Sequence, residues 1–323
     1  MELDDFLAEW QNGNKQLLVH TSGSTGAPKP LWVEKERMLQ SARITCDFLG
    51  LQPGDTALLC MSLDYIAGKM MVVRSIERQL QLVMVRPCGH PLADPSLLPA
   101  TGIDFAAMVP MQVYNTLQVP TEREQLARIK HLIIGGGAID EALEKELQKL
   151  PGAVWSTYGM TETLSHIALR RLNGPEASEW YQPFDSVKIS LSAENCLVID
   201  APLVCAAPLA TNDIAEIKAT EQGPLFRIKG RKDNVICSGG IKIQIEEVEA
   251  LLRPHLSAPF LLAKKKDSKF GEIAVLVSTA NNLAEIKQVC QTQLPKYWIP
   301  REYIHMDKLP LTGTGKPKRN LFL

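Results

Sequence analysis

The sequence lacks any long run of hydrophobic residues. No window approaches the roughly 18 consecutive apolar residues that a membrane-spanning helix needs. The chain opens on the acidic segment Met1–Asp5, so it also lacks the basic and then apolar start of a secretory leader. Both absences disfavour the membrane and secretion, and they predict a soluble protein of the cytoplasm with no membrane span.

Paired cysteines and an excess of one charge are missing as well. The seven cysteines form no Cys-x-x-Cys pair and show no zinc-site spacing with histidine, which is typical of reduced thiols. Lys and Arg (35) nearly balance Asp and Glu (36), and the formal net charge is -1. Because such a chain has no global positive field, we expect no nucleic-acid partner.

The composition is that of an ordinary globular protein. The 323 residues correspond to about two domains at roughly 150 residues each. Hydrophobic residues make up 45% and charged residues 22%, values that allow a large core and disfavour disorder.

The first half of the chain alternates short apolar runs with helix-like stretches. This layout predicts an α/β fold with a mostly parallel sheet. After the first run, Met38, Ala42, Cys46 and Leu49 fall on one helical face, and Gly50 follows as a stop signal. Six runs are predicted to be its buried strands: Leu17–His20, Ala57–Cys60, Leu82–Val85, Phe105–Val109, Leu132–Ile134 and Val154–Tyr158.

The pattern changes after about Arg171. Alternating residues then predict antiparallel hairpins attached to the α/β body. Beyond Asp233 the pattern indicates a small α+β domain with helices around Ile245–Leu252 and Leu283–Cys290 and a strand at Ile273–Val277. We therefore expect a large N-terminal domain, residues 1–231, and a small mobile C-terminal domain, residues 232–323.

A loop rich in hydroxyl groups and glycine follows the first apolar run. Glycine lets backbone N–H groups turn inward, and lysine adds a mobile positive charge, so this loop can wrap a triphosphate. No Ser or Thr follows Lys29, so the loop is not the phosphate loop of kinases. A flexible Ser/Gly turn is the alternative. Its candidate phosphate ligands are Thr21, Ser22, Gly23, Ser24, Thr25, Gly26 and Lys29.

A second motif, Tyr158-Gly159-Met160-Thr161-Glu162, ends an apolar run, where open α/β sheets place their ligands. Thr161 can donate to a phosphate oxygen, and Glu162 can hold a magnesium ion that bridges phosphates. The alternative is a simple helix start. Upstream, Gly136 and Gly137 either let a flat ring approach the backbone or form a tight turn.

Two further segments carry polar groups. Asp213 can accept hydrogen bonds from both ribose hydroxyls, and Arg231 can assist at the same sugar. A glycine-rich segment near the end of the chain presents Lys316. Taken alone, the first two residues read as surface charges, and the last segment reads as a frayed tail.

In their order and spacing, the segments TSGSTGAPK, YGMTE, GRKDNVICSGG and TGTGK resemble the adenylate-forming superfamily of acyl-CoA ligases, adenylation domains and luciferases. The resemblance implies that residues 21–29 bind the phosphates of ATP, that Thr161 contacts the α-phosphate, and that Glu162 is the Mg²⁺ ligand. It also implies that Asp213 and Arg231 lie at the ribose.

The same resemblance assigns roles in the C-terminal part. Lys316 matches the lysine that stabilises charge during adenylation. Asp233 matches a hinge about which the small domain rotates between two half-reactions. Gly239 and Gly240 match a loop that faces the active site while the thioester with coenzyme A forms.

The sequence departs from the superfamily pattern at three places. Only residues 1–20 precede the phosphate loop, so the resemblance implies that the usual N-terminal subdomain, with part of the acyl or CoA surface, is missing or reduced. Tyr65 stands where histidine is common, and Pro30 replaces a usual glycine. None of these changes removes a phosphate ligand, so we expect an active enzyme.

Within the superfamily, the sequence most resembles the ligases that act on 2-succinylbenzoate in menaquinone biosynthesis. That acid carries a second carboxylate on an aromatic ring. Arg74 matches a basic residue of those enzymes and would hold the second carboxylate, Ser165 and His166 would offer polar contacts, and Tyr65 would form a flat wall. The alternative for Arg74 is an exposed arginine on a helix.

The predicted function is therefore ATP-dependent ligation of a carboxylic acid to CoA. The alternatives are a ligase for another small aromatic or dicarboxylic acid, or a nucleotide-binding relative without turnover. The expected partners are the acid, ATP with Mg²⁺, and CoA. The sequence leaves the oligomeric state undetermined, and a homodimer is one option.

Overall fold

The computed structural model describes residues 1–20, 30–137, 139–311 and 317–319. The chain divides into two compact units. Unit 1 holds residues 1–189, 199–209 and 218–226, and unit 2 holds residues 190–198, 210–217 and 227–323. In the predicted hairpin region the chain passes several times between the two units. The sequence-based domain boundary after Arg231 therefore stays a prediction.

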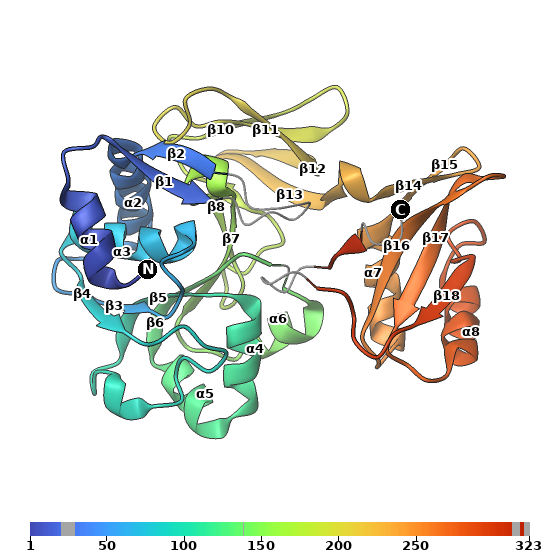
Figure 1. The fold of residues 1–323 in the computed structure, drawn as a ribbon, viewed down its shortest axis with the longest axis horizontal. Helices are drawn as coiled ribbons and strands as arrows, with labels where there is room; N and C mark the ends of the chain where they lie inside the picture. Colours follow the sequence, from blue (N-terminus) through green and yellow to red (C-terminus); the bar gives the residue numbers. More distant parts are fainter. Residues whose placement is uncertain (21–29, 138, 312–316, 320–323) are drawn as a thin grey trace. The chain divides into compact units, whose positions relative to one another are not determined.

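A seven-stranded sheet forms the centre of unit 1 (Figure 1). Its strand order is β4-β3-β5-β6-β7-β8-β9, with parallel pairing from β4 to β7 and antiparallel pairing from β7 to β9. The α/β prediction is confirmed. The strands are β3 (Thr56–Leu59), β4 (Gln81–Met84), β5 (Ile103–Met108), β6 (Ile129–Ile134), β7 (Ala153–Gly159), β8 (His166–Arg171) and β9 (Gln182–Pro183).

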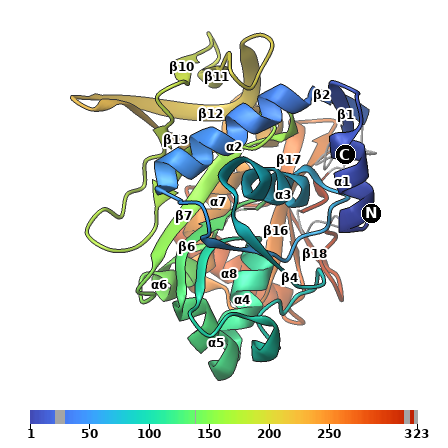
Figure 2. The same cartoon turned by 90° about the vertical axis from the view of Figure 1, so that its left-hand side faces the viewer.

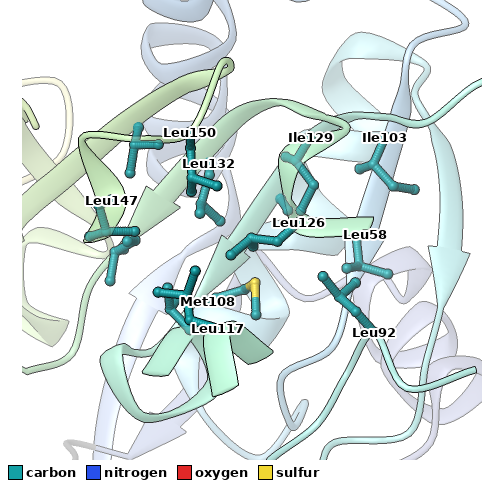
Figure 3. Packing of buried hydrophobic residues seen from close by; sticks show 14 of the residues in the cluster. Leu58, Leu92, Ile103, Met108, Leu117, Leu126, Ile129, Leu132, Leu147 and Leu150 are labelled. Atoms are coloured by element: carbon teal, nitrogen blue, oxygen red, sulfur yellow. The ribbon is translucent and has the colours of Figure 1, made fainter. Parts of the chain in front are cut away.

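Helices cover both faces of this sheet. On one face, Figure 2 shows α2 (Lys35–Leu49) and α3 (Ile66–Arg78) side by side, and Phe48 meets Trp155 of β7 edge to face at 5.3 Å. On the other face, α4 (Pro110–Gln118), α5 (Pro120–Ala127) and α6 (Glu141–Leu147) bury a leucine-rich core against β3, β5 and β6 (Figure 3). Covering both faces explains why these strands read as continuous apolar runs.

The buried face and the end of the second helix agree with the sequence analysis. Met38, Ala42, Cys46 and Leu49 are all buried on one face of α2, as predicted. Gly50 ends the helix in the left-handed conformation, with φ at 66°, which glycine adopts without a steric penalty.

The prediction for the first apolar run was wrong in its pairing. Leu17–His20 lies in β1 (Gln16–His20), which pairs antiparallel with β2 (Pro30–Glu34) in a separate two-stranded sheet. Residues 21–29 are too few for the crossover of a dozen or more residues that parallel pairing needs. Five of the six predicted strands therefore belong to the parallel region. Helix α1 (Leu3–Gln11) and the short η1 (Pro95–Leu97) complete this part of the chain.

The predicted antiparallel hairpins form a four-stranded sheet in the order β10-β11-β12-β13. Residues of this sheet are shared between the two units. Its strands are β10 (Lys188–Leu191), β11 (Cys196–Asp200), β12 (Leu209–Thr220) and β13 (Gly223–Arg231).

The C-terminal part of unit 2 is a small α+β body, as predicted. Its five-stranded sheet has the order β15-β14-β17-β16, and β18 pairs parallel with β17. Helices α7 (Ile245–Leu252) and α8 (Leu283–Gln293) pack their buried faces on this sheet. The remaining elements are η3 (Lys232–Asn234), β14 (Val235–Ser238), β15 (Ile241–Gln244), η4 (Arg253–His255), β16 (Phe260–Asp267), β17 (Gly271–Ser278) and β18 (Glu302–His305).

None of the helices in the described ranges combines the length and the apolar character that crossing a bilayer requires.

Candidate active site

The Tyr158–Glu162 motif lies where β7 ends and the chain folds back into β8. Gly159 pairs with His166 across this return, at an irregularity in the β7–β8 register. A Cβ atom at Gly159 would lie 2.2 Å from the carbonyl oxygen of Ser165 and 2.4 Å from Cα of His166. Only glycine fits there, so Gly159 is the residue that allows the loop to close.

The closed loop places two predicted nucleotide residues in a short turn, η2 (Thr161–Thr163). Thr161 is 7% exposed, whereas the side chain of Glu162 is exposed. The thiol of Cys205 donates to the carbonyl oxygen of Glu162 at 3.3 Å and fixes the backbone at that residue. The turn therefore holds a buried hydroxyl beside an exposed carboxylate.

The residue after this turn is strained. Leu164 is buried and has a φ of 64°, a conformation that side chains with a Cβ rarely adopt. Such strain costs on the order of 1–3 kcal/mol and persists only where the surrounding contacts hold it. Here it lies between Glu162 and Ser165, the predicted metal ligand and a predicted substrate residue.

The chemistry of Glu162 fits a magnesium ion that is shared with phosphates. Within the part of the chain that the structure describes, no group of three His, Cys, Asp or Glu side chains gathers to form a protein-only metal site. Mg²⁺ normally takes one or two carboxylates and completes its shell with water and substrate phosphate oxygens. One exposed carboxylate is thus the donor set that a nucleotide-bound Mg²⁺ requires.

Arg74 lies in α3 and is buried, with 2% of its surface exposed. The reading of Arg74 as an exposed helix arginine is therefore excluded. Its Nη2 donates to Oγ of Ser165 at 2.6 Å, and its Nη1 lies 3.8 Å from Sδ of Met71. Among the described residues, no carboxylate pairs with this guanidinium, and its Nε has no hydrogen-bond partner.

A buried cation of this kind is electrostatically incomplete. Burial lowers the pKa of Arg74 to about 10, an effect that the nearby Cys46 opposes, and the group stays charged at neutral pH. A buried charge is normally compensated by an opposite charge or a set of hydrogen bonds. Among the described residues, Arg74 lacks the opposite charge that normally compensates a buried cation.

His166 lies on β8 beside Ser165 and is 6% exposed. Its Nδ1 is 3.2 Å from Oγ of Ser165, and its Nε2 is 3.1 Å from Oγ1 of Thr45 in α2. Burial, together with the charge of Arg74, holds the pKa of His166 well below its usual value, so the ring is neutral at pH 7. The structure thus brings together three of the four predicted substrate residues.

Thr45 is a member of this group that the sequence analysis missed. In sequence it is a polar residue on the buried face of an amphipathic helix, next to Cys46, and that position gives the only signal. Tyr65, the fourth predicted substrate residue, is 44% exposed at the start of α3. It precedes Arg74 by nine residues, about 13 Å along a helix, so its role stays a prediction.

The predicted ribose residues form a separate cluster in unit 2. Arg231 donates to Oδ1 of Asp213 at 3.2 Å and to Oδ2 of Asp233 at 2.9 Å, while Asn212 also donates to Asp233 at 3.3 Å. The side chains of Asp213, Arg231 and Asp233 are 13%, 38% and 44% exposed. The cluster presents carboxylate oxygens that can accept sugar hydroxyls, and the hinge role of Asp233 stays a prediction.

Glycines account for two of the predicted loops through backbone geometry. Gly239 and Gly240 join β14 to β15, and both have positive φ, 58° and 84°, as a two-residue hairpin turn of type I′ requires. Gly136 has a φ of 81°, and Gly137 lies next to Pro110. The structure shows a tight turn at Gly239–Gly240 and a bend at Gly136–Gly137. The predicted contacts with CoA and the adenine ring stay predictions.

Two predicted groups lie outside the described residues. These are the phosphate-loop residues Thr21, Ser22, Gly23, Ser24, Thr25, Gly26 and Lys29, and the adenylation lysine, Lys316.

Comparison with known proteins places these features in a family. The sequence model of the family described as AMP-binding enzyme matches residues 8–202. The 2-succinylbenzoate–CoA ligase of Listeria monocytogenes is 25% identical over 99% of this chain and 72% of its own length.

Two solved structures extend the comparison. The acyl-CoA synthetase (AMP-forming)/AMP-acid ligase II-like protein of Dyadobacter fermentans is 34% identical, covers 98% of this chain and 91% of its own, and superposes with a TM-score of 0.66. The O-succinylbenzoate coenzyme A synthetase of Bacillus subtilis, solved with ATP and magnesium ion, is 23% identical over 94% of this chain and 69% of its own, with a TM-score of 0.75. From the family match and these likenesses over nearly all of this chain, the chain belongs to the AMP-binding enzyme family and is an AMP-forming acid–CoA ligase.

Proposed function

We propose that this enzyme joins 2-succinylbenzoate to CoA, with ATP as the energy source and AMP and pyrophosphate as products. The buried Arg74, which has no carboxylate partner among the described residues, carries the proposal. A substrate with one carboxylate to activate and a second one to bind would supply the charge that Arg74 lacks. The resemblance to 2-succinylbenzoate–CoA ligases supports this choice of acid.

The proposed reaction has two steps. An oxygen of the aliphatic carboxylate attacks the α-phosphorus of ATP, the bond from that phosphorus to pyrophosphate breaks, and an acyl-adenylate forms. The sulfur of CoA then attacks the acyl carbon and AMP leaves. Bound Mg²⁺ would offset negative charge on the phosphates during the first step.

The nucleotide roles follow from the donor chemistry. We assign Glu162 as the protein ligand of Mg²⁺, Thr161 as a donor to the α-phosphate, and Asp213 as the acceptor for ribose hydroxyls. The exposed carboxylate of Glu162 supports the first assignment, and the carboxylate of Asp213 supports the last. The structure of the Bacillus subtilis synthetase with ATP and magnesium ion supports these cofactors by analogy.

The experiment compares acids that differ in one group. AMP formation that depends on CoA is measured with 2-succinylbenzoate and with 4-oxo-4-phenylbutanoate, which is the same skeleton without the ring carboxylate. Benzoate and succinate serve as fragments. We expect 2-succinylbenzoate to be preferred by at least about 100-fold in kcat/KM, the effect of leaving a buried charge unpaired. Equal use of the two skeletons would overturn the choice of substrate.

Lys316 gives a second test, of the reaction rather than of the acid. We expect Lys316→Ala to abolish formation of the acyl-adenylate while CoA still reacts with acyl-adenylate that is supplied. Pyrophosphate release measures the first step and thioester absorbance measures the second. Equal loss of both steps would contradict the role of Lys316.

If pyrophosphate is released with other acids of a broad panel but not with 2-succinylbenzoate, the alternative of a ligase for another small aromatic or dicarboxylic acid is correct. The cytoplasmic location stays a prediction, which cell fractionation would check. The homodimer also stays a prediction, which light scattering would check.

A further inference from the structure

The hydrogen bonds around Arg74 have a fixed direction, which the proton count of each group determines. Thr45 has one hydroxyl proton, and it donates that proton to the carbonyl oxygen of Ser41 at 3.0 Å, one turn earlier in α2. Towards His166, Oγ1 of Thr45 can then only accept. With the Thr45 proton assigned to Ser41, the imidazole nitrogen that faces Oγ1, Nε2, is assigned the hydrogen.

The remaining bonds follow from this first one. In a neutral imidazole only one nitrogen carries hydrogen, so Nδ1 of His166 accepts the hydroxyl proton of Ser165. The Ser165 oxygen then turns its lone pairs to Nη2 of Arg74, which always donates. The chain runs from Arg74 through Ser165, His166 and Thr45 to the carbonyl of Ser41, and each hydroxyl or imidazole proton is used once.

This chain explains how Arg74 is held while its charge stays available. Of its donors, the only short contact with the described residues is the one from Nη2 to Ser165, whereas Nε has no partner. A carboxylate in place of Ser165 would have neutralised the charge of Arg74 within the protein. Neutral groups fix the direction of the guanidinium and leave the charge for a ligand.

We propose that Thr45 and His166 are positioning residues that orient Arg74 through Ser165 and thereby set the preference for acids with a second carboxylate. The proposal rests on the proposed function, because it takes Arg74 as the group that binds that carboxylate. Neither residue needs to contact the substrate.

The chain offers a matched pair of variants. Thr45→Val keeps the shape of the side chain and removes the acceptor for Nε2 of His166. Thr116→Val makes the same change at another fully buried helix threonine, in α4, whose hydroxyl has no hydrogen-bond partner among the described residues. Thr45→Ser retains the hydroxyl and serves as the rescue variant.

The kinetic test uses the full chain, saturating ATP and CoA, and the two skeletons that differ in the ring carboxylate. We expect Thr45→Val to reduce the preference for 2-succinylbenzoate about tenfold, mainly through KM for that acid, because small misplacements of binding groups have effects of this size or larger. KM for ATP should not change. Thr45→Ser should restore the preference, and Thr116→Val should match the wild type. A wild-type preference in Thr45→Val overturns the proposal.

The second readout needs no substrate. In ¹⁵N-labelled protein, with His166→Gln used to assign the ring, the proposal predicts the Nε2–H tautomer for His166 and a gain of the Nδ1–H tautomer in Thr45→Val. An Nδ1–H tautomer in the wild type overturns it. If the wild type does not use 2-succinylbenzoate, the proposed function and the role of Thr45 and His166 in specificity are both wrong. The tautomer of His166 still shows the direction of the hydrogen bonds between Arg74 and Ser41.

Discussion

Two arginines in this enzyme occupy opposite electrostatic environments. Arg74 is buried, has no carboxylate partner among the described residues, and is held by a serine. Arg231 is 38% exposed and is shared between the carboxylates of Asp213 and Asp233. Both were selected from the sequence as ligand-binding residues, yet among the described residues only Arg231 has carboxylate partners.

The difference indicates distinct roles. A charge that is already paired and partly hydrated gains little from a further partner, because exposed ion pairs contribute about 0–1 kcal/mol. A buried charge without a counterion gains much more from a bound anion. Arg74 should therefore determine which acid is used, whereas Arg231 should orient Asp213 without determining specificity.

Removal of Arg74 should give the largest effect. We expect Arg74→Ala to lower kcat/KM for 2-succinylbenzoate by about 100- to 1000-fold, since the substrate carboxylate would lose its buried partner. KM for ATP should stay within about twofold of the wild type, which also shows that the variant is folded. Initial rates of AMP formation measure both quantities. An unchanged kcat/KM for 2-succinylbenzoate would show that Arg74 does not bind the acid.

The reciprocal change should affect the nucleotide. We expect Asp213→Asn to raise KM for ATP about tenfold, because the amide loses both the charge and one of the acceptor oxygens. The constant for the acid should not respond. If Asp213→Asn and Arg74→Ala instead affect the same substrate, the comparison between the two sites is incorrect.

The buried His166 should make the stability of the protein depend on pH. The pKa of His166 is lower in the folded protein than its usual 6.5, so below about pH 6.5 the unfolded chain binds a proton there that the folded chain does not. As the pH is lowered below about 6.5, the free energy of unfolding should then decrease by about 1.4 kcal/mol per pH unit from this group. Urea unfolding at pH 7.5, 6.5 and 5.5 gives this free energy at each pH, and its dependence on pH should be weaker in His166→Gln. Identical slopes would mean that His166 titrates in the folded state as in the unfolded state.

The exposed side of the second cluster should matter least. Asp233→Ala removes one carboxylate partner of Arg231 at a side chain that is 44% exposed. We expect the free energy of unfolding to change by less than about 0.5 kcal/mol. Denaturant unfolding checks this, and a loss above 2 kcal/mol would show that the exposed pair stabilises the fold.

The sequence predicted the helices and strands well because hydrophobic periodicity is a local property. The buried face of α2 and its glycine stop could both be identified from spacing. The pairing of β1 could not, because an apolar run does not say which strand it meets. The length of the segment that follows, residues 21–29, was the missed indication of an antiparallel return.

The candidate site was predictable only in its residue types. Arg74, Ser165 and His166 could be selected by resemblance, but whether Arg74 was buried or exposed could not. Thr45 was missed because it lies 121 positions from His166 in sequence and carries no motif. Hydrogen bonds between side chains from α2, α3 and β8 arise only when those elements are packed.

The amino-acid sequence by itself determined the α/β class, the buried face and glycine stop of α2, and the choice of candidate ligand-binding side chains, because these depend on local spacing and chemical type. Tertiary structure decided that Arg74 has no counter-charge among the described residues and that Thr45 belongs to its group. The physical reason is that burial and hydrogen-bond direction are set by atoms that are distant in the chain.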